Sequence, residues 1–210
     1  MREEPPGKDY PIMKHLLITG FDPFGGESVN PSWEAVRALP ETIGDIAIHK
    51  LQLPTVFGAA PGKVLERADD LKPDAVLSVG QAGGRSGVTV EYVAINLRHA
   101  RIADNAGQQP QDQPVVPGGP AAYFATVPVR RMVSAVEAAG IPCAASYTAG
   151  TFVCNEVLYS LLHRFAGGPT LAGFIHLPYL PEQAGDGQPS LPLADMVKAL
   201  EAAIGAIFEA

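Results

Sequence analysis

The sequence has few cysteines, few basic residues and no long apolar run. Two cysteines among 210 residues are too few for a structural zinc site, and we expect reduced thiols rather than a disulfide. Lys and Arg number 15 against 22 Asp and Glu, a formal net charge of −7, which argues against a surface for nucleic acid or an anionic membrane. No run approaches the roughly 20 apolar residues of a membrane span. We therefore expect a small neutral or peptide-like substrate, with no nucleic-acid or membrane partner.

The first 13 residues differ in character from the rest of the chain. They are polar, contain three prolines and lack the apolar core of a secretory signal. They end in Met13, directly before the apolar run KHLLITG. We expect a disordered N-terminal extension over residues 1–13, or a start assigned too early with Met13 as the working one, followed by a single domain over 14–210. The expected compartment is the cytoplasm.

Short apolar runs alternate with segments of helical spacing along residues 14–210. Runs typical of strands lie at 15–20, 45–54, 74–80, 88–96, 142–147 and 171–179. Helical spacing occurs at 62–71, 121–139, 152–165 and 192–208, and a further helix is predicted to begin at Asn30-Pro31. Residues 97–120 are rich in Gln, Pro and Gly and predict a long loop. Together these segments indicate a three-layer α/β/α fold with a mostly parallel twisted sheet, like that of phosphorylases and hydrolases.

Two glycine-rich loops, at 20–26 and 80–85, follow predicted strands. The first has the four-residue gap of a phosphate-binding loop but lacks the following Lys and Ser/Thr, and the second does not fit G-x-G-x-x-G. Pro23 also removes a backbone donor that a phosphate cradle would use. Open α/β sheets bind ligands beyond the carboxyl ends of their strands. Phe21 and Phe24 therefore suit the wall of a pocket for a small flat ligand.

The two cysteines lie in different settings. Cys143 is inside a short apolar strand and should be an inert, buried residue. Cys154 follows T-A-G-T at the predicted start of a helix, where free N–H groups and the helix dipole favour a thiolate and an oxyanion. Buried thiols are more often structural than catalytic, but a strand–turn–helix placement resembles the nucleophile elbow of other hydrolases. Both interpretations of Cys154 stay open.

A cysteine nucleophile needs a base, and His176 is favoured among five histidines. His163 is in the same predicted helix as Cys154, roughly 13 Å further along it, and cannot reach the thiol. His176 lies near the carboxyl end of a predicted buried strand. In a parallel sheet that end shares an edge with the turn before Cys154. The alternative is a core histidine bonded to a backbone carbonyl.

Such a site also needs an acceptor that fixes the imidazole tautomer. Glu91 is the one acid in the alternating run VTVEYVAIN, but alternation alone does not distinguish a site from an outward face. Asp104 and Arg101 are the next polar candidates, and alone they are typical of a solvated loop with an ion pair.

Four segments of the chain together resemble the pyroglutamyl peptidase type I family, also called pyrrolidone-carboxylate peptidase. They are LLITGFDPFGGESVNPSWEAV (16–36), GQAGGRSGVTVEYVAINLRHARIADNAGQQP (80–110), SYTAGTFVCNEVLYSLLH (146–163) and AGFIHLPYLPEQ (172–183). Their order and separation agree with the family from about residue 14 to the end of the chain. The likeness is therefore far more specific than one short motif.

The resemblance implies a cysteine peptidase that removes N-terminal pyroglutamate from peptides through a thioester, as a homotetramer and without a metal or other cofactor. It assigns Cys154 as nucleophile, His176 as base and Glu91 as the orienting acid. The residues that it places around the lactam are Phe21, Phe24, Ile102, Phe152 and Val153. It also implies a backbone contact from Gln81 and an oxyanion role for Arg101 or the Cys154 amide.

Four residues depart from what is common in the family: Tyr92, His99, Ala103 and Glu156. They bear on rate and pH optimum, and Glu156 adds a negative charge that would slightly raise the pKa of the nearby thiol. Two other functions remain compatible with the fold, since function depends on the site. These are a nucleoside phosphorylase or hydrolase, and a non-catalytic binding module.

Overall fold

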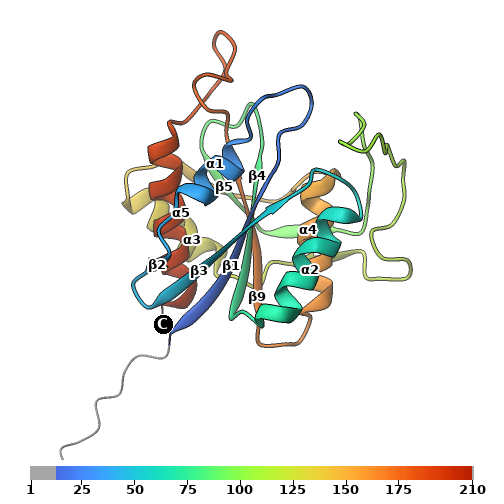
Figure 1. Ribbon diagram of the computed structural model, residues 1–210, viewed down its shortest axis with the longest axis horizontal. Coiled ribbons are helices and arrows are strands. Elements are labelled where there is room, and N and C mark those ends of the chain that lie inside the picture. Colours follow the sequence, from blue (N-terminus) through green and yellow to red (C-terminus); the bar gives the residue numbers. More distant parts are fainter. Residues whose placement is uncertain (1–12, 210) are drawn as a thin grey trace, which may run out of the picture.

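A seven-stranded sheet forms the centre of the computed structural model, which describes residues 13–209 (Figure 1). Its strands are β1 (Lys14–Phe21), β2 (Thr42–Ile43), β3 (Ile46–Leu53), β4 (Ala75–Gln81), β5 (Val88–Glu91), β8 (Cys143–Ser146) and β9 (Leu171–Leu177). Across the sheet they follow the order β2-β3-β1-β4-β9-β5-β8. The short strands β6 (Val93–Ile95) and β7 (Ala122–Phe124) form a separate antiparallel pair.

The central strands run in one direction and the strands at one side reverse it. β1 is parallel to β3 and β4, and β4 is parallel to β9. β5 pairs antiparallel with β9, and β8 pairs parallel with β5. The sheet is therefore mostly parallel, as predicted, with a reversal between β9 and β5 that the sequence did not reveal.

Helices cover both faces of this sheet and give the predicted three layers. One face carries α1 (Pro31–Ala38), α3 (Val129–Ala138) and α5 (Leu193–Phe208), and the other carries α2 (Ala59–Leu71) and α4 (Val153–Arg164) (Figure 1). Burial of their apolar sides against the sheet forms two separate cores, one on each face. None of the helices in residues 13–209 has the length and apolar character to cross a membrane.

Local sequence explains where most elements begin and end. β1, β4 and β9 are almost wholly buried apolar runs, as expected of strands covered on both faces. Asn30 caps α1 by accepting a hydrogen bond from the Ser32 amide, and Pro31 is the first helical residue, as predicted.

Two predicted elements are wrong in extent. The run 88–96 is not one strand, because the chain turns at Tyr92 and passes from β5 in the large sheet to β6 in the small one. The helical pattern at 121–139 holds only from Val129, and residues 122–124 are β7. A three-residue strand is too short for its periodicity to be distinguished from that of a helix.

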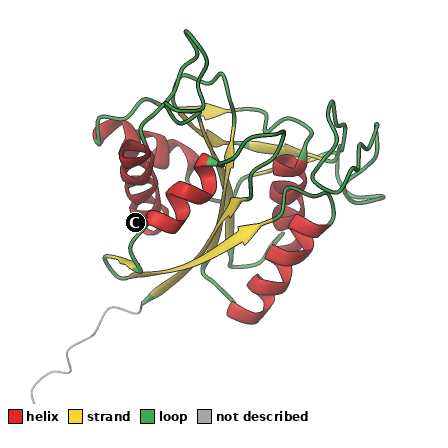
Figure 2. Cartoon of the chain, turned by 45° about the horizontal axis from the view of Figure 1, so that its top comes forward, coloured by secondary structure: helices red, strands yellow, loops and turns green. Residues whose placement is uncertain are grey.

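The predicted long loop is present between β6 and β7, where residues 96–121 contain no helix or strand (Figure 2). Asp104 lies within it and, contrary to expectation, is buried. Its carboxylate accepts hydrogen bonds from the amides of Phe57, Ala106 and Gln108 at 2.8–2.9 Å. The predicted solvated ion pair of Asp104 with Arg101 does not occur among the described residues. Asp104 instead anchors the loop to the segment before α2.

The predicted N-terminal extension lies, apart from Met13, outside the described residues. Met13 itself is exposed and directly precedes β1.

Candidate active site

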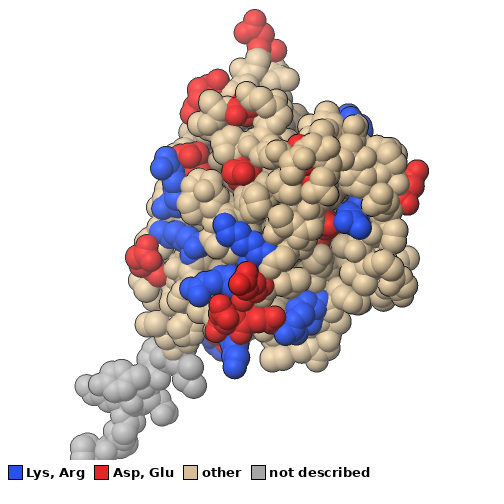
Figure 3. Space-filling model, turned by 45° about the vertical axis from the view of Figure 1, so that its right-hand side comes forward, with Lys and Arg blue, Asp and Glu red and all other residues tan. Residues whose placement is uncertain are grey.

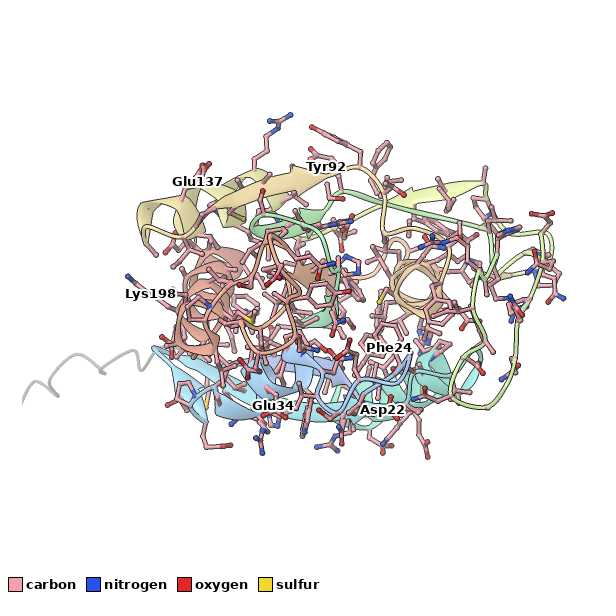
Figure 4. All side chains as sticks on the ribbon, turned by 90° about the horizontal axis from the view of Figure 1, so that it is seen from above. Asp22, Phe24, Glu34, Tyr92, Glu137 and Lys198 are labelled. Carbon is pink, nitrogen blue, oxygen red and sulfur yellow. The ribbon has the colours of Figure 1, made fainter. Side chains whose placement is uncertain are left out.

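Cys154 and His176 line one cavity of about 260 Å³ at the end of the sheet where β1 and β4 finish. Four other residues predicted for the site also line it: Phe21, Phe24, Gln81 and Phe152. Phe24 comes from the loop after β1 and lies on the inner side of that loop (Figure 4). The structure therefore brings together six residues from four separate parts of the sequence.

Cys154 is the second residue of α4. In the described part of the chain, neither its N–H nor that of Val153 donates a hydrogen bond to another residue. Free N–H groups at the start of a helix can stabilise negative charge. On the opposite side of the thiol lies Gly80, where an added Cβ would be 2.9 Å from the Cys154 sulfur. Only glycine leaves room for the thiol at this place.

Glu91 and His176 form a buried hydrogen-bonded pair. The His176 Nδ1 donates to Glu91 Oε1 at 2.7 Å, and the two side chains are almost completely excluded from solvent. The sheet register explains the contact. Thr89 pairs with His176, so Glu91 lies two residues further along β5 on the same face. This hydrogen bond leaves Nε2 of His176 without a proton and able to accept one.

The proximity of Cys154 and His176 has a different origin from the predicted one. β8 runs opposite to β9, because it is parallel to β5 and β5 is antiparallel to β9. The turn before Cys154 therefore does not share a strand edge with the end of β9. Residues 147–152 instead carry the chain to the cavity that His176 lines. No hydrogen bond joins Cys154 to His176 among residues 13–209; such bonds often tighten only when substrate is bound.

Burial dominates the protonation of the two reactive groups. Burial, with the charge of Glu91, raises the pKa of the Cys154 thiol to about 12, although Arg85 and the amide of Cys154 itself oppose this rise. Burial also lowers the pKa of His176, despite the hydrogen bond and charge of Glu91. The resting pair is therefore a neutral thiol and a neutral imidazole. The helix dipole alone would favour a thiolate, but burial of the thiol opposes its ionisation.

Glu91 stays ionised in spite of its burial. Burial acts to raise its pKa, but the hydrogen bond and charge of His176, followed by Ser146 and by the hydrogen bond from Arg85, bring the pKa below its usual value. Ser146 lies close enough to add to this lowering, although its hydroxyl donates to the Thr148 carbonyl. The carboxylate can thus orient His176 and stabilise the imidazolium that forms when it takes a proton.

Besides Glu91, which lies behind His176, three predicted site residues lie outside the cavity wall. Val153 is fully buried at the start of α4. Ile102 and Arg101 are exposed and line a neighbouring cavity of about 420 Å³, which shares Phe24 and Phe152 with the first. Their predicted contacts with substrate, and the oxyanion role of Arg101, remain predictions.

Four polar residues that were not predicted for the site also line the cavity: Asn30, Thr55, Arg85 and Thr148. Asn30 was recognised only as a helix cap. Arg85 follows the glycines of the loop 80–85, which the sequence places at a ligand-binding strand end without assigning a role to the arginine. The only indication in the sequence that Arg85 lines the cavity is that it lies in a loop directly after a buried strand.

The four residues that differ from what is common in the family make their contacts away from the Cys154 thiol. Glu156 accepts hydrogen bonds from the Gly58 amide and from Arg98, so the acid that most raises the Cys154 pKa is Glu91 and not Glu156. His99 contacts Asp112. Tyr92 lies at the outer edge of the molecule (Figure 4). Ala103 is exposed, and nothing in the structure explains its choice.

The described residues show neither a basic surface on the face in Figure 3 nor a cluster of metal-ligating side chains. On the face that Figure 3 shows, Lys and Arg are interspersed with Asp and Glu, and the described residues form no continuous basic surface there. Within residues 13–209, no three His, Cys, Asp or Glu side chains gather as a metal site would require.

The sequence model of one family, described as pyroglutamyl peptidase, matches residues 14–210. The chain belongs to the pyroglutamyl peptidase family. Two curated relatives named pyrrolidone-carboxylate peptidase are similar to it. The protein from Cupriavidus necator is 57% identical over 198 residues, covering 91% of this chain and 92% of its own. That from Chromobacterium violaceum is 56% identical over 195 residues, covering 91% of each chain.

Solved structures of pyroglutamyl peptidases share the fold. The crystal structure of pyroglutamyl peptidase I from Bacillus amyloliquefaciens has a TM-score of 0.88 and 48% identity, covering 92% of this chain and 96% of that one. The pyrrolidone carboxyl peptidase from Thermococcus litoralis has a TM-score of 0.88 and 38% identity, covering 93% of both chains. The family assigns the chain to the peptidases and argues against a nucleoside phosphorylase or a non-catalytic binding module.

Proposed function

We propose that this protein removes N-terminal pyroglutamate from peptides, with Cys154 as nucleophile, His176 as general base and Glu91 as the acid that orients it. One observation carries the proposal: a thiol at the start of a helix lines the same cavity as a histidine that is fixed by a buried carboxylate. This is the arrangement that nucleophilic catalysis by cysteine needs.

The reaction begins from the neutral pair. Nε2 of His176 takes the proton of Cys154 as the sulfur attacks the pyroglutamyl carbonyl, and the N–H groups at the start of α4 receive the oxyanion. His176 then gives its proton to the departing amine, which leaves a thioester. Water activated by His176 hydrolyses the thioester and restores the thiol. Every step uses side chains and backbone N–H groups of this chain, together with water, and we propose no metal or other cofactor.

The selectivity for pyroglutamate follows from the apolar wall of the cavity. Phe21, Phe24 and Phe152 suit the faces of a neutral lactam ring, and we propose Ile102 and Val153 as supporting residues. Backbone groups at Gln81 would pair with the lactam N–H and C=O. A prolyl terminus lacks that amide, so it would leave the partner groups buried and unpaired, which is costly.

The test is release of a fluorescent amine from a pyroglutamyl amide under thiol reductant, with a prolyl amide as the control substrate. Cys154→Ser should abolish turnover, whereas Cys143→Ser, which changes the thiol on edge strand β8, should leave it close to wild type. Absence of pyroglutamyl turnover in reduced wild-type protein would contradict the proposed function. Loss of activity in Cys143→Ser alone would contradict the assignment of the nucleophile.

We also propose that the protein works in the cytoplasm as a homotetramer. A catalytic thiol must stay reduced, and reducing compartments maintain free cysteines such as Cys143 and Cys154. An aromatic cluster beside edge strand β8, in which Phe124 and Tyr147 are exposed and Tyr92 is half-buried, supports association of several copies.

A further inference from the structure

Arg85 contacts the buried acid of the site from the loop that follows β4. Its Nη1 donates to Glu91 Oε1 at 2.7 Å, and its side chain is 27% exposed. The same oxygen accepts the hydrogen bond from Nδ1 of His176. The other oxygen, Oε2, is buried and has no hydrogen-bond partner among the described residues. Arg85 and His176 are therefore the two direct partners of this carboxylate.

The guanidinium also reaches the segment that leads to the nucleophile. Nη2 donates to the carbonyl of Thr148 at 3.1 Å, and Nη1 contacts the hydroxyl of Thr89 on β5. Thr148 opens the stretch 148–152, which lines the cavity and ends at the cap of α4. The planar side chain of Arg85 thus joins Glu91 on β5 to the segment 148–152 that positions Cys154. Arginine suits this geometry because its guanidinium donates from several nitrogens at once, which lysine cannot reproduce.

A buried carboxylate needs a compensating charge. Arg85 is the only cation that forms an ion pair with Glu91 in the described residues, apart from a protonated His176. If Arg85 were absent, Glu91 could be compensated only by a charged imidazole. A charged His176 could not accept the proton of Cys154.

We propose that Arg85 is a positioning residue of the reaction, which neutralises the buried charge of Glu91 and ties this acid to the loop before Cys154. His176 is thereby kept oriented but uncharged, ready to act as a base. This inference rests on the proposed function, in which His176 is the base.

The charged and titratable side chains that face His176 are Glu91 from β5, Arg85 from the loop after β4 and Cys154 from α4. Burial is the main cause of the lowered His176 pKa, and the positive charge of Arg85 adds to it. Removal of that charge should raise the pKa. Activity requires neutral His176 and falls as pH drops through its pKa. The acid limb of the pH profile should therefore move to higher pH.

The experiment compares Arg85→Met, Arg85→Gln and Arg85→Lys with wild type, and uses Arg67→Met, an exposed arginine on α2, as the matched control. In the two neutral variants kcat should fall by about tenfold to a hundredfold, with little change in KM. The acid limb of the pH profile of kcat should move to higher pH. Arg85→Lys should retain the position of the acid limb and recover part of kcat. Arg67→Met should match wild type in both respects.

NMR titration of the His176 imidazole, assigned with His176→Asn, gives a readout that does not need turnover. A higher His176 pKa in a folded neutral variant supports the role of Arg85, even if the wild type proves inactive on pyroglutamyl amides, a result that would contradict only the proposed function. An unchanged His176 pKa in a neutral variant that folds like wild type would overturn the inference. Two neutral variants guard against misfolding of one, and thermal melting identifies the folded ones.

Discussion

Gly80 shows how strongly one residue can constrain the nucleophile. An added Cβ would lie 2.9 Å from the Cys154 sulfur and 2.9 Å from two atoms of the Phe174 ring. Neither neighbour has room to retreat, because Phe174 is buried and Cys154 is held at the start of a helix. The smallest substitution at this position should therefore displace the thiol.

We expect Gly80→Ala to lower kcat/KM by about a hundredfold, because a displacement of about 1 Å is enough for such a loss. Overpacking should also reduce the free energy of unfolding by about 1–3 kcal/mol. The measurements are steady-state kinetics and denaturant unfolding. Gly205→Ala is the matched control, because Gly205 lies in α5 with open space around it and should become slightly more stable with full activity. Wild-type kinetics in Gly80→Ala would contradict the tight fit.

Cys154, His176 and Glu91 were predictable to different degrees. Local placement, at a helix start and near the end of a buried strand, favours the first two but leaves a structural role open for each. Glu91 needed the family resemblance, because alternation along a strand does not show which face is covered. Its burial depends on β5 lying between β9 and β8. Arg85 was missed for a similar reason, since its contacts with Glu91 and Thr148 exist only after these strands have paired.

At the scale of elements, the first turn of α4 serves both the site and the long loop. Cys154 lines the cavity, whereas the next two residues hold the chain that follows β6. Asn155 bonds to the backbone of Ile95 and Leu97, and Glu156 accepts from Arg98. The helix that presents the nucleophile is thus fixed by the loop 96–121. Changes that loosen this loop should therefore alter the position of Cys154 in the cavity.

Asp104 is the residue through which the anchoring of this loop can be tested. Asp104→Asn replaces a carboxylate that accepts from three backbone amides with a group that has only one acceptor oxygen. We expect a loss of about 1–3 kcal/mol in the free energy of unfolding, and faster hydrogen exchange at the amides of Phe57, Ala106 and Gln108. Asp112→Asn, in an exposed part of the same loop, is the control and should change neither. Unchanged exchange in Asp104→Asn would show that the loop does not depend on this carboxylate.

The elements predicted best are the strands that are buried along nearly their whole length. β1, β4 and β9 are continuous apolar runs, and their positions were predicted within two residues. The reversal of direction between β9 and β5 was not predictable, because a strand has the same side-chain pattern in either direction. That reversal explains why the predicted common edge of Cys154 and His176 was wrong, although both residues line the same cavity.

At the scale of the whole molecule, the aromatic cluster is the surface that we propose for the association of copies. Phe124 and Tyr147 are 71% and 65% exposed, and Tyr92 packs against both. They lie beside β8, which is at the edge of the sheet. Exposed aromatic groups and an unpaired strand edge are both features that association would cover.

We expect light scattering on wild-type protein to give the mass of four chains, and the double variant Phe124→Ser/Tyr147→Ser to give a smaller assembly at the same concentration. The loss of buried aromatic area should weaken association without disturbing the cavity, so the dissociated variant should keep its turnover of pyroglutamyl amide per chain. Met13→Ser, which removes an exposed apolar side chain at the start of β1, is the control and should leave the mass unchanged. A double variant with the wild-type mass would exclude this cluster from the contact between copies. A smaller assembly that had also lost activity would instead mean that the contact supports the site.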